Sequence, residues 1–321
     1  VRSAHLKQPL DALTEAARAS ARQNLACGIT RVRDAGDRHG INHRIRAEAL
    51  QPGSGLSQVR SGGLGVKRPK RYGAFMARDV EDDAAIRISV AKLARDNDEI
   101  KLILTGIIDF DAGAVTDEPQ FDADSAHLVV ETARAHGRKT FAHCSGAKGL
   151  TVAVAAGVGS IEHGFFMSRD ILEQMAAQGI AWTPTFCPVH FQWAHPEAVG
   201  WSAQTVGNLR RILDQHAHHL TLAHQLGVPL LIGTDAGSMG VEHGHALFEE
   251  IDRYLEAGLP LAATLQAATA AARRHFGEGE PLLAKGGTFD ALLLEASPFE
   301  NVSALRGPRK VWTANTRFDM N

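Results

Sequence analysis

The chain has 321 residues, of which 44% are hydrophobic and 22% are charged, the proportions of an ordinary globular protein. Its formal charge of −2 and its pI of about 6.8 argue against a polyanion or a membrane surface as partner. No apolar run reaches the roughly 18 residues of a membrane span, and an odd number of cysteines, three, argues against a disulfide framework. We therefore expect a cytoplasmic protein that binds neither nucleic acid nor membrane; homo-oligomer formation is left open.

The first part of the chain predicts one helix, one strand and a long loop. Apolar residues recur at helical spacing over residues 9–27, and a strand over 29–33 follows Gly28. Residues 51–73 are rich in Gly and Pro and are interpreted as a long loop with at most one short strand, near 58–60. Loops of this length are often functional lids or binding loops. The basic run 67–71 within it is taken as a solvated loop rather than a nucleic-acid patch.

From residue 79 helices and strands alternate regularly, which predicts a parallel sheet. The expected helices cover residues 79–96, 122–137, 147–156, 168–179 and 203–226. The strands that follow them cover residues 99–105, 139–144, 159–163, 180–186 and 228–234. A glycine stands between a helix and the next strand at four of these junctions, where a left-handed helix cap is favoured: Gly137, Gly157, Gly179 and Gly227.

The last part of the chain changes character. Helices are expected at residues 244–257 and 260–275, and residues 286–295 and 310–318 are expected to be strands of a separate small sheet. The pattern predicts a (β/α)₈ barrel over residues 1–284 and a small β element over 285–321. Seven barrel strands can be counted where eight are needed, so the first would have to precede the first helix, where only Val1 to Gln8 are available.

Lys101 is an ammonium group in an otherwise apolar strand. Burying such a charge is costly unless it is paired or neutralised. Reaction with CO₂ would convert the amine into an anionic carbamate that can bridge two metal ions. The alternatives are a snorkelling or salt-bridged lysine, or an amine that forms a Schiff base with a substrate carbonyl.

His143 and His163 each stand near the end of a strand whose other residues are mostly small or apolar. Imidazole is the commonest metal ligand, and a second group usually orients the ring. A lone histidine at such a place is more often a satisfied core or loop residue. Two of them at the ends of successive strands favour a shared site.

Asp235 lies between glycines in the stretch Gly233–Gly237, which permits tight backbone turns beside a ligand. A carboxylate at this place can bind a metal and can take a proton from metal-bound water. The alternative is that Asp235 caps the helix that follows.

Three further histidines are candidates for substrate binding, because each follows the end of a strand: His190, His243 and His245. Four others lie on one long helix without forming a ligand face and are expected to be mostly exposed: His216, His218, His219 and His224.

In this order, the stretches resemble the amidohydrolase superfamily, in particular its imidazolonepropionase-like and prolidase-like branch, over about residues 14–318. Asn24–Gly36 looks like the second barrel strand of that branch. The most specific signature is Ala142–Gly149 together with Gly157–Gly164, and Gly233–Gly237 resembles the eighth strand. The tail from Lys285 to Phe318 resembles part of the small β-sandwich beside the barrel.

The resemblance implies a metal-dependent hydrolase, with one or two Zn²⁺ ions, that uses metal-activated water to cleave a C–N bond in an amide, a cyclic amide or a dipeptide. Iron, cobalt or manganese would also suit such ligands. Lys101 would be the carboxylated bridging lysine, His143 and His163 would bind the second metal, and Asp235 would bind the first metal and act as the general base.

One departure from the family pattern concerns its first strand, which ends in a His-x-His pair that binds the first metal. Here Ser3 and His5 could stand in for that pair, or the written chain begins after it. In the second case one barrel strand is missing and the second metal position remains. The rival hypothesis is a truncated or degenerate barrel that binds a ligand or a single metal without turnover.

Overall fold

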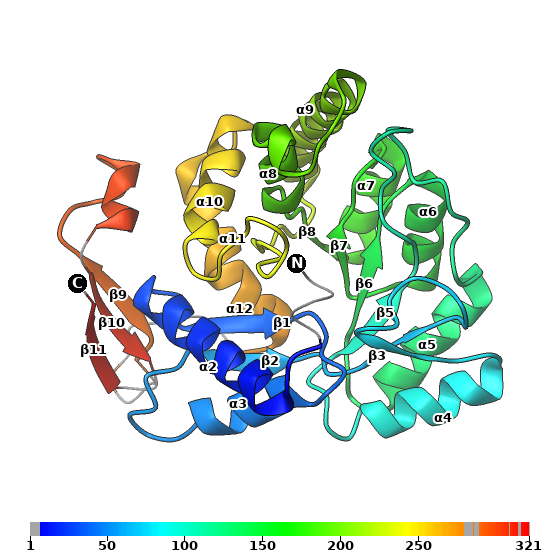
Figure 1. Cartoon of the computed structure of the whole chain (residues 1–321), viewed down its shortest axis with the longest axis horizontal. Helices are drawn as coiled ribbons and strands as arrows, with labels where there is room; N and C mark the ends of the chain where they lie inside the picture. Colours follow the sequence, from blue (N-terminus) through cyan, green and yellow to red (C-terminus); the bar gives the residue numbers. More distant parts are fainter. Residues whose placement is uncertain (1–6, 279–284, 286–288, 308, 314–315, 321) are drawn as a thin grey trace.

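The computed structural model describes residues 7–278, 285, 289–307, 309–313 and 316–320. Parallel strands form its centre and helices surround them (Figure 1). Six strands form one sheet in the order β4 (Ala77–Asp79), β3 (Gly65–Lys67), β5 (Ile100–Ile103), β6 (Thr140–Cys144), β7 (Ser160–His163) and β8 (Ala181–Thr183). All neighbouring pairs in it are parallel, which confirms the expectation from the helix–strand alternation.

A second, two-stranded sheet continues this arrangement. Strand β1 (Arg31–Asp34) pairs in parallel with β2 (Gln58–Ser61). The chain runs from β2 into β3 almost without a break, and β3 pairs with β5 through Val66 and Leu102. The segment from β2 to β3 therefore joins the two sheets. The strand expected before the first helix falls on residues 1–6, outside the described residues, as do Ser3 and His5.

The strand expected over residues 228–234 is much shorter than predicted. It is reduced to a parallel bridge between Leu230 and Trp182, supported by the hydrogen bond from the Leu231 amide to the Trp182 carbonyl (2.8 Å). Gly233 still lies against β8, since a Cβ there would meet the Thr183 side chain at 2.6 Å, and the backbone takes a positive φ at Asp235 (50°).

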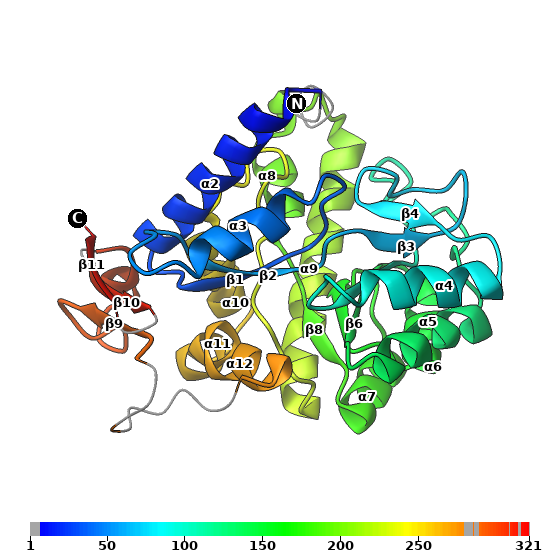
Figure 2. The ribbon, with the colours of Figure 1, turned by 90° about the horizontal axis from the view of Figure 1, so that it is seen from below.

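The helices cover the outside of the strands, and α4 to α7 lie side by side (Figure 2). Their bounds are α2 (Leu10–Ala26), α3 (Ile41–Ala49), α4 (Asp83–Leu93), α5 (Ala123–Ala135), α6 (Ala147–Ala156), α7 (Arg169–Gln178), α8 (Cys187–Ala194), α9 (Ala203–Leu226), α10 (Ala246–Glu256), α11 (Leu261–Ala268) and α12 (Ala270–Phe276), with short 3₁₀ turns at Pro196–Ala198 and Val302–Arg306. The four junction glycines all have positive φ, as predicted for left-handed caps: Gly137 (69°), Gly157 (71°), Gly179 (68°) and Gly227 (78°). In the described part of the chain no helix is long and apolar enough to span a bilayer.

A small antiparallel sheet lies beside α2, at the end of the molecule away from α5 and α6 (Figure 1). Its strands, in spatial order, are β11 (Thr316–Met320), β10 (Arg309–Thr313) and β9 (Ala291–Leu294). Its contact with α2 includes a hydrogen bond from the Arg309 guanidinium to the Cys27 carbonyl (2.5 Å). The separate small sheet is confirmed, although the single strand expected over 310–318 is a hairpin. The predicted boundary at 284/285 adjoins residues that are not described.

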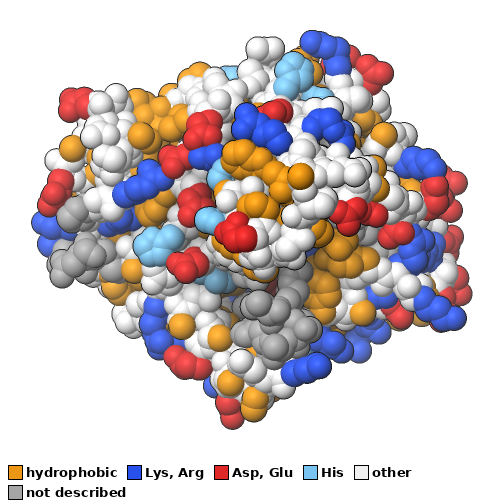
Figure 3. Space-filling view, turned by 45° about the horizontal axis from the view of Figure 1, so that its top comes forward, with side chains coloured by type: hydrophobic (Ala, Val, Ile, Leu, Met, Phe, Trp, Pro, Cys, Tyr) orange, Lys and Arg blue, Asp and Glu red, His pale blue; other side chains and the backbone are white. Residues whose placement is uncertain are grey.

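The loop expected over 51–73 contains more structure than predicted. It holds β3 as well as β2, and its basic run is not a solvated loop. Lys67 is only 3% exposed and its ammonium lies 2.5 Å from the Asp79 carboxylate, whereas Arg68 donates to the Val80 carbonyl (3.1 Å) and to the Ser125 hydroxyl (2.9 Å). Acidic and basic side chains are interspersed over the face drawn in Figure 3.

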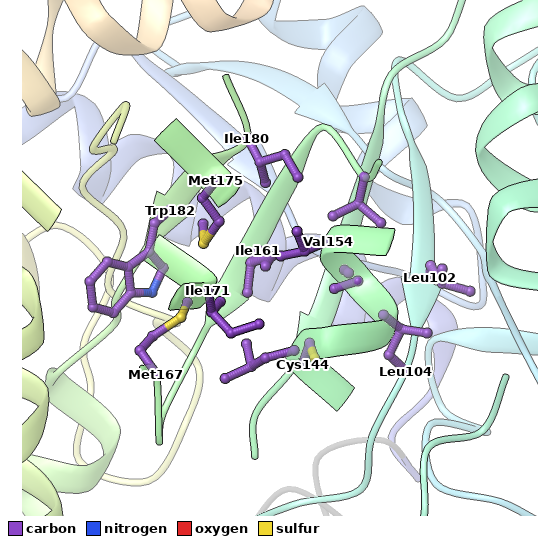
Figure 4. Packing of buried hydrophobic residues seen from close by; sticks show 14 of the residues in the cluster. Leu102, Leu104, Cys144, Val154, Ile161, Met167, Ile171, Met175, Ile180 and Trp182 are labelled. Atoms are coloured by element: carbon purple, nitrogen blue, oxygen red, sulfur yellow. The ribbon is translucent and has the colours of Figure 1, made fainter. Parts of the chain in front are cut away.

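Strand alternation divides the side chains into an outward apolar set and an inward polar set. The outward set packs against the surrounding helices in one large core (Figure 4), to which the strands contribute Leu102, Cys144, Ile161 and Trp182. The residues between them point to the interior of the strand arrangement, and they include Lys101, His143 and Glu162. The interior therefore carries the polar groups of the candidate site.

Candidate functional site

Lys101 lies in the interior on β5 and is only 4% exposed. Its ammonium donates a hydrogen bond to the Ala35 carbonyl (2.5 Å) and lies 5.6 Å from the centre of the Phe141 ring. Burial lowers the pKa of Lys101 to about 8, an effect that the nearby carboxylates, Asp235 first, partly oppose. A buried amine with such a pKa is partly neutral at mildly alkaline pH. Because the side chain is buried and its ammonium donates to the Ala35 carbonyl, the snorkelling alternative is wrong.

His143 and His163 come together as the sequence predicts. Their ring centroids are 4.7 Å apart with the planes at 72°. His143 Nε2 lies 3.3 Å from the Gly106 carbonyl, and His163 Nδ1 lies 2.7 Å from the Thr185 hydroxyl. With His143 Nε2 donating to the Gly106 carbonyl, the lone pair of the His143 ring is on Nδ1. The contact of His163 Nδ1 with Thr185 leaves Nε2 of the His163 ring for a ligand.

The backbone at the end of β7 makes this meeting possible. By register, His143 pairs with Glu162 and Cys144 pairs with His163, so regular alternation would turn His163 outward. Instead His163 has a φ of +69°, a conformation rare for residues other than glycine, and the Trp182 indole donates to its carbonyl (2.9 Å). Strain of this kind is typical of functional sites.

Asp235 also has a positive φ, of +50°, and it is half-buried. The Ser238 hydroxyl donates to its carboxylate (2.9 Å). The helix that follows, α10, begins only at Ala246, so the alternative that Asp235 caps that helix is wrong. Because its charge acts on the pKa of Lys101, the two groups share one electrostatic environment.

Several further residues of this region were not predicted from the sequence. The Arg33 guanidinium lies 2.6 Å from the Glu162 carboxylate, which also accepts a hydrogen bond from Ser160 (2.7 Å). Burial opposes ionisation of Glu162, but the ion pair and the Ser160 hydrogen bond keep its pKa below the ordinary value. Burial raises the pKa of Asp34 to about 6. The signal was available for Asp34, which ends a strand as His143 does.

Of the three histidines predicted to bind substrate, His190 and His245 make contacts outside this cluster. His190 lies on α8 and its Nε2 is 2.7 Å from the Arg253 guanidinium; burial, and then Arg253, lower its pKa to about 4. Burial also lowers the pKa of His243. His245 is exposed and lies 2.9 Å from the Gln23 amide of α2. Their role in substrate binding therefore stays a prediction.

The prediction that His216 is exposed is wrong. It is 1% exposed, is stacked on Phe165 with ring centroids 3.9 Å apart, and has its Nε2 3.0 Å from the Pro184 carbonyl. Burial lowers its pKa to about 3, so it is neutral and structural. His218 and His224 are exposed and His219 is half-buried.

The donor groups fit a metal ion only if Lys101 takes part. Within the described ranges, no three His, Cys, Asp or Glu side chains come together as a metal-binding group. His143 and His163 supply two nitrogen donors, so a carbamate on Lys101 would be the third. A hollow of about 520 Å³ lined by Phe166, Met167 and α9 lies elsewhere and contains none of these donors.

Comparisons with known proteins show the family and the fold of the chain. The model of the amidohydrolase family matches residues 3–313. An uncharacterised protein of Mycobacterium tuberculosis is 28% identical over 253 residues, which are 79% of this chain and 67% of that protein. An ochratoxinase of Aspergillus niger is 29% identical over 197 residues, 60% of this chain but only 40% of that enzyme. The crystal structure of a Xaa-Pro dipeptidase with bound methionine in the active site superposes with a TM-score of 0.83 at 23% identity, over 98% of this chain and 82% of that one, which shows a shared fold.

Proposed function

Because the chain belongs to the amidohydrolase family, we propose that it is a metal-dependent hydrolase that cleaves a C–N bond in an amide, a cyclic amide or a dipeptide. The observation that carries the proposal is the buried Lys101 in the same interior as the paired imidazoles of His143 and His163. The arrangement suits zinc, and other divalent transition metals would suit it too.

Lys101 would reach its metal-binding form by reacting with CO₂. The neutral amine forms an N–C bond, one C=O electron pair moves onto oxygen, and the displaced proton leaves to solvent. A pKa near 8 makes the neutral amine accessible at neutral to mildly alkaline pH. The resulting carbamate would join His143 Nδ1 and His163 Nε2 as donors, while Asp235 would serve the other metal position.

When bound, a divalent metal supplies Lewis acidity that acidifies water and polarises a carbonyl. Asp235 acts as the general base: its carboxylate takes a proton from the attacking water and later returns it to the departing amine nitrogen. The Ser238 hydroxyl orients that carboxylate, and the positive φ of Asp235 sets the direction of its side chain.

The relatives suggest where to look for a substrate. One of them is an ochratoxinase and the structural neighbour is a Xaa-Pro dipeptidase, both named for the molecules that they cleave. We therefore propose a small-molecule amide or dipeptide that carries an amino acid.

The first test is metal content per chain, measured by plasma mass spectrometry on protein purified without chelator. We expect about one ion if only the Lys101–His143–His163 position is complete and about two if both positions are. The variant His163→Ala should lose this metal. The matched control His218→Ala, which changes an exposed histidine on α9, should keep it.

Three outcomes would overturn the proposal. Equal metal content in His163→Ala and in the parent chain would show that the metal is bound elsewhere. Borohydride trapping of a carbonyl compound on Lys101 would support Schiff-base chemistry in place of metal-dependent hydrolysis. A metal-free chain without hydrolase activity would favour the non-catalytic ligand-binding alternative.

A further inference from the structure

Apolar side chains lie beside His143, on loops that the proposed chemistry does not use. The Tyr72 ring centroid is 5.3 Å from that of His143, with the planes at 36°. The Phe75 ring meets Tyr72 edge-on at 5.7 Å. Both rings are half-buried.

The loop that carries these rings is held in place. The Gln120 side chain bridges it, since its amide donates to the Tyr72 carbonyl (3.1 Å) and its carbonyl accepts from the Arg68 amide (3.1 Å). Gly73 has a φ of +106°, and a Cβ there would approach the Ile103 side chain to 3.1 Å. The loop is therefore fixed against β5, two residues beyond Lys101, and it presents its rings in a defined position.

Ile107 adds an aliphatic surface on a different loop. It is 64% exposed, and it directly follows Gly106, whose carbonyl contacts His143. Binding sites for small molecules combine a largely apolar and aromatic lining with a few placed polar groups. Half-buried aromatic rings and an exposed aliphatic residue beside the half-buried His143 and His163 and the buried Lys101 match that composition.

We propose that Tyr72, Phe75 and Ile107 form the surface that binds a large apolar group of the substrate, an aromatic ring above all. The inference rests on the proposed hydrolase function and narrows its substrate class to amides that carry an aromatic or branched apolar substituent close to the scissile bond. Tyr72 and Ile107 then act in specificity, through contact with the substrate.

The rival explanation is that Tyr72 only supports the His143 ring. In that case its truncation would weaken metal binding and would affect every substrate alike. A specificity surface predicts a different result, because loss of the ring should matter only for ligands that reach it.

The test is calorimetric binding of N-acetyl-L-alanine and N-(2-naphthoyl)-L-alanine to the zinc-loaded chain, with N-acetyl-L-phenylalanine to sample the amine side. We expect one of the two aromatic ligands to bind about tenfold to hundredfold more tightly than N-acetyl-L-alanine. The variants Ile107→Ala and Tyr72→Ala should remove most of that ratio at unchanged metal content. The matched control Ile88→Ala, at a position on α4 that is 70% exposed, should retain it.

The outcomes separate this inference from the function on which it rests. Equal affinity for all three ligands, or an equal loss for all of them in Tyr72→Ala, would overturn the apolar surface. Hydrolysis of the same compounds is measured in parallel. Selective aromatic binding to the zinc-loaded chain that depends on Ile107, without hydrolysis of any of the three compounds, would support the surface and contradict the hydrolase.

Discussion

The two ends of the strand arrangement both bury charged side chains, but they treat them differently. At the amino end Arg33 and Arg60 each lie 3.7 Å from the Glu99 carboxylate, and Arg60 lies 3.3 Å from Glu278. The Phe276 ring of α12 covers both guanidinium groups, at 5.6 and 4.7 Å from its centre. Each buried charge there has an opposite charge nearby, which closes this end with a balanced ionic network.

The carboxyl end holds Lys101 in another way. Among the described residues no carboxylate lies within 4.0 Å of its ammonium, and its hydrogen bond goes to the neutral Ala35 carbonyl. A buried charge without a close partner changes its pKa, whereas a paired one keeps its charge. Ion pairs at the amino end therefore stabilise the fold. At the carboxyl end Lys101 has no close ion-pair partner, and its lowered pKa makes the amine available for reaction.

The largest effect is expected where the pairing is closest. The variant Arg33→Met removes the guanidinium between Glu162 and Glu99 and leaves both buried carboxylates without their main partner. We expect the free energy of unfolding, measured by urea denaturation, to fall by about 3–5 kcal/mol. The control Arg210→Met, in an exposed helical pair with Asp214, should change it by about 0.5 kcal/mol or less.

A second variant keeps this prediction informative if Arg33→Met does not fold. Adding Glu162→Gln removes the nearer unpaired charge and should restore part of the lost stability. If Arg33→Met unfolds at the same urea concentration as Arg210→Met, the pairing at the amino end is not structural.

Much of the fold could be predicted from the sequence because its signals are local. The periodicity of α9 and the glycines at the helix ends gave α4 to α7, α9 and the strands between α4 and α8 within a few residues, whereas α8 was not predicted. Strand β3, within residues 51–73, could not be predicted in this way, because it is three residues long and its position depends on pairing with β4 and β5. The expected strand at 228–234 was apolar enough, but its pairing is reduced to one bridge and the backbone takes a positive φ at Asp235.

The candidate site was predicted in part, for a related reason. Lys101, His143 and His163 stand out because each is a polar residue that ends or interrupts an apolar strand. The two imidazole rings do meet. His216 could not be placed, since it looks polar on an amphipathic helix and only the stack on Phe165 shows that it is buried. Arg33 and Tyr72 belong to other segments, and their contacts with the site depend on the tertiary fold.

The second prediction concerns Lys101 in the metal-free, CO₂-free chain. Its pKa is about 8 in the folded state and near 10.4 in the unfolded state, so between these values the unfolded chain binds more protons. Stability should therefore rise with pH from about 8 to about 10.4, by about 3 kcal/mol at most, and should not change through this group below pH 8. The variant Lys101→Met should lack this rise and should be at least as stable at pH 7.

Urea denaturation of both proteins at pH 7 and pH 9.5 measures the difference, and the comparison cancels the other groups that titrate in this range. Parallel curves for the two proteins would mean that Lys101 is paired after all. The changes in the free energy of unfolding at Lys101 and Arg33 should have opposite signs. Removal of the poorly paired buried charge of Lys101 should stabilise the fold, whereas removal of Arg33 leaves buried carboxylates unpaired and should destabilise it.

The smallest change in stability is expected at Thr185, at the carboxyl end. Here substitution should change metal binding much more than it changes the free energy of unfolding. Thr185→Val keeps the shape of the side chain but removes the hydroxyl that lies 2.7 Å from His163 Nδ1. Because the proposed site would hold zinc through Nε2 of this ring, the loss should lower the zinc affinity about tenfold to hundredfold, measured by competition with a chromogenic chelator. The free energy of unfolding of the metal-free chain should fall by about 1 kcal/mol or less.

Thr205→Val, which removes a hydroxyl bonded to Asp111 away from these histidines, serves as the control and should leave the zinc affinity unchanged. If Thr185→Val binds zinc as tightly as the parent chain, His163 is oriented by its backbone strain alone, and the hydroxyl is a packing partner like those of the core.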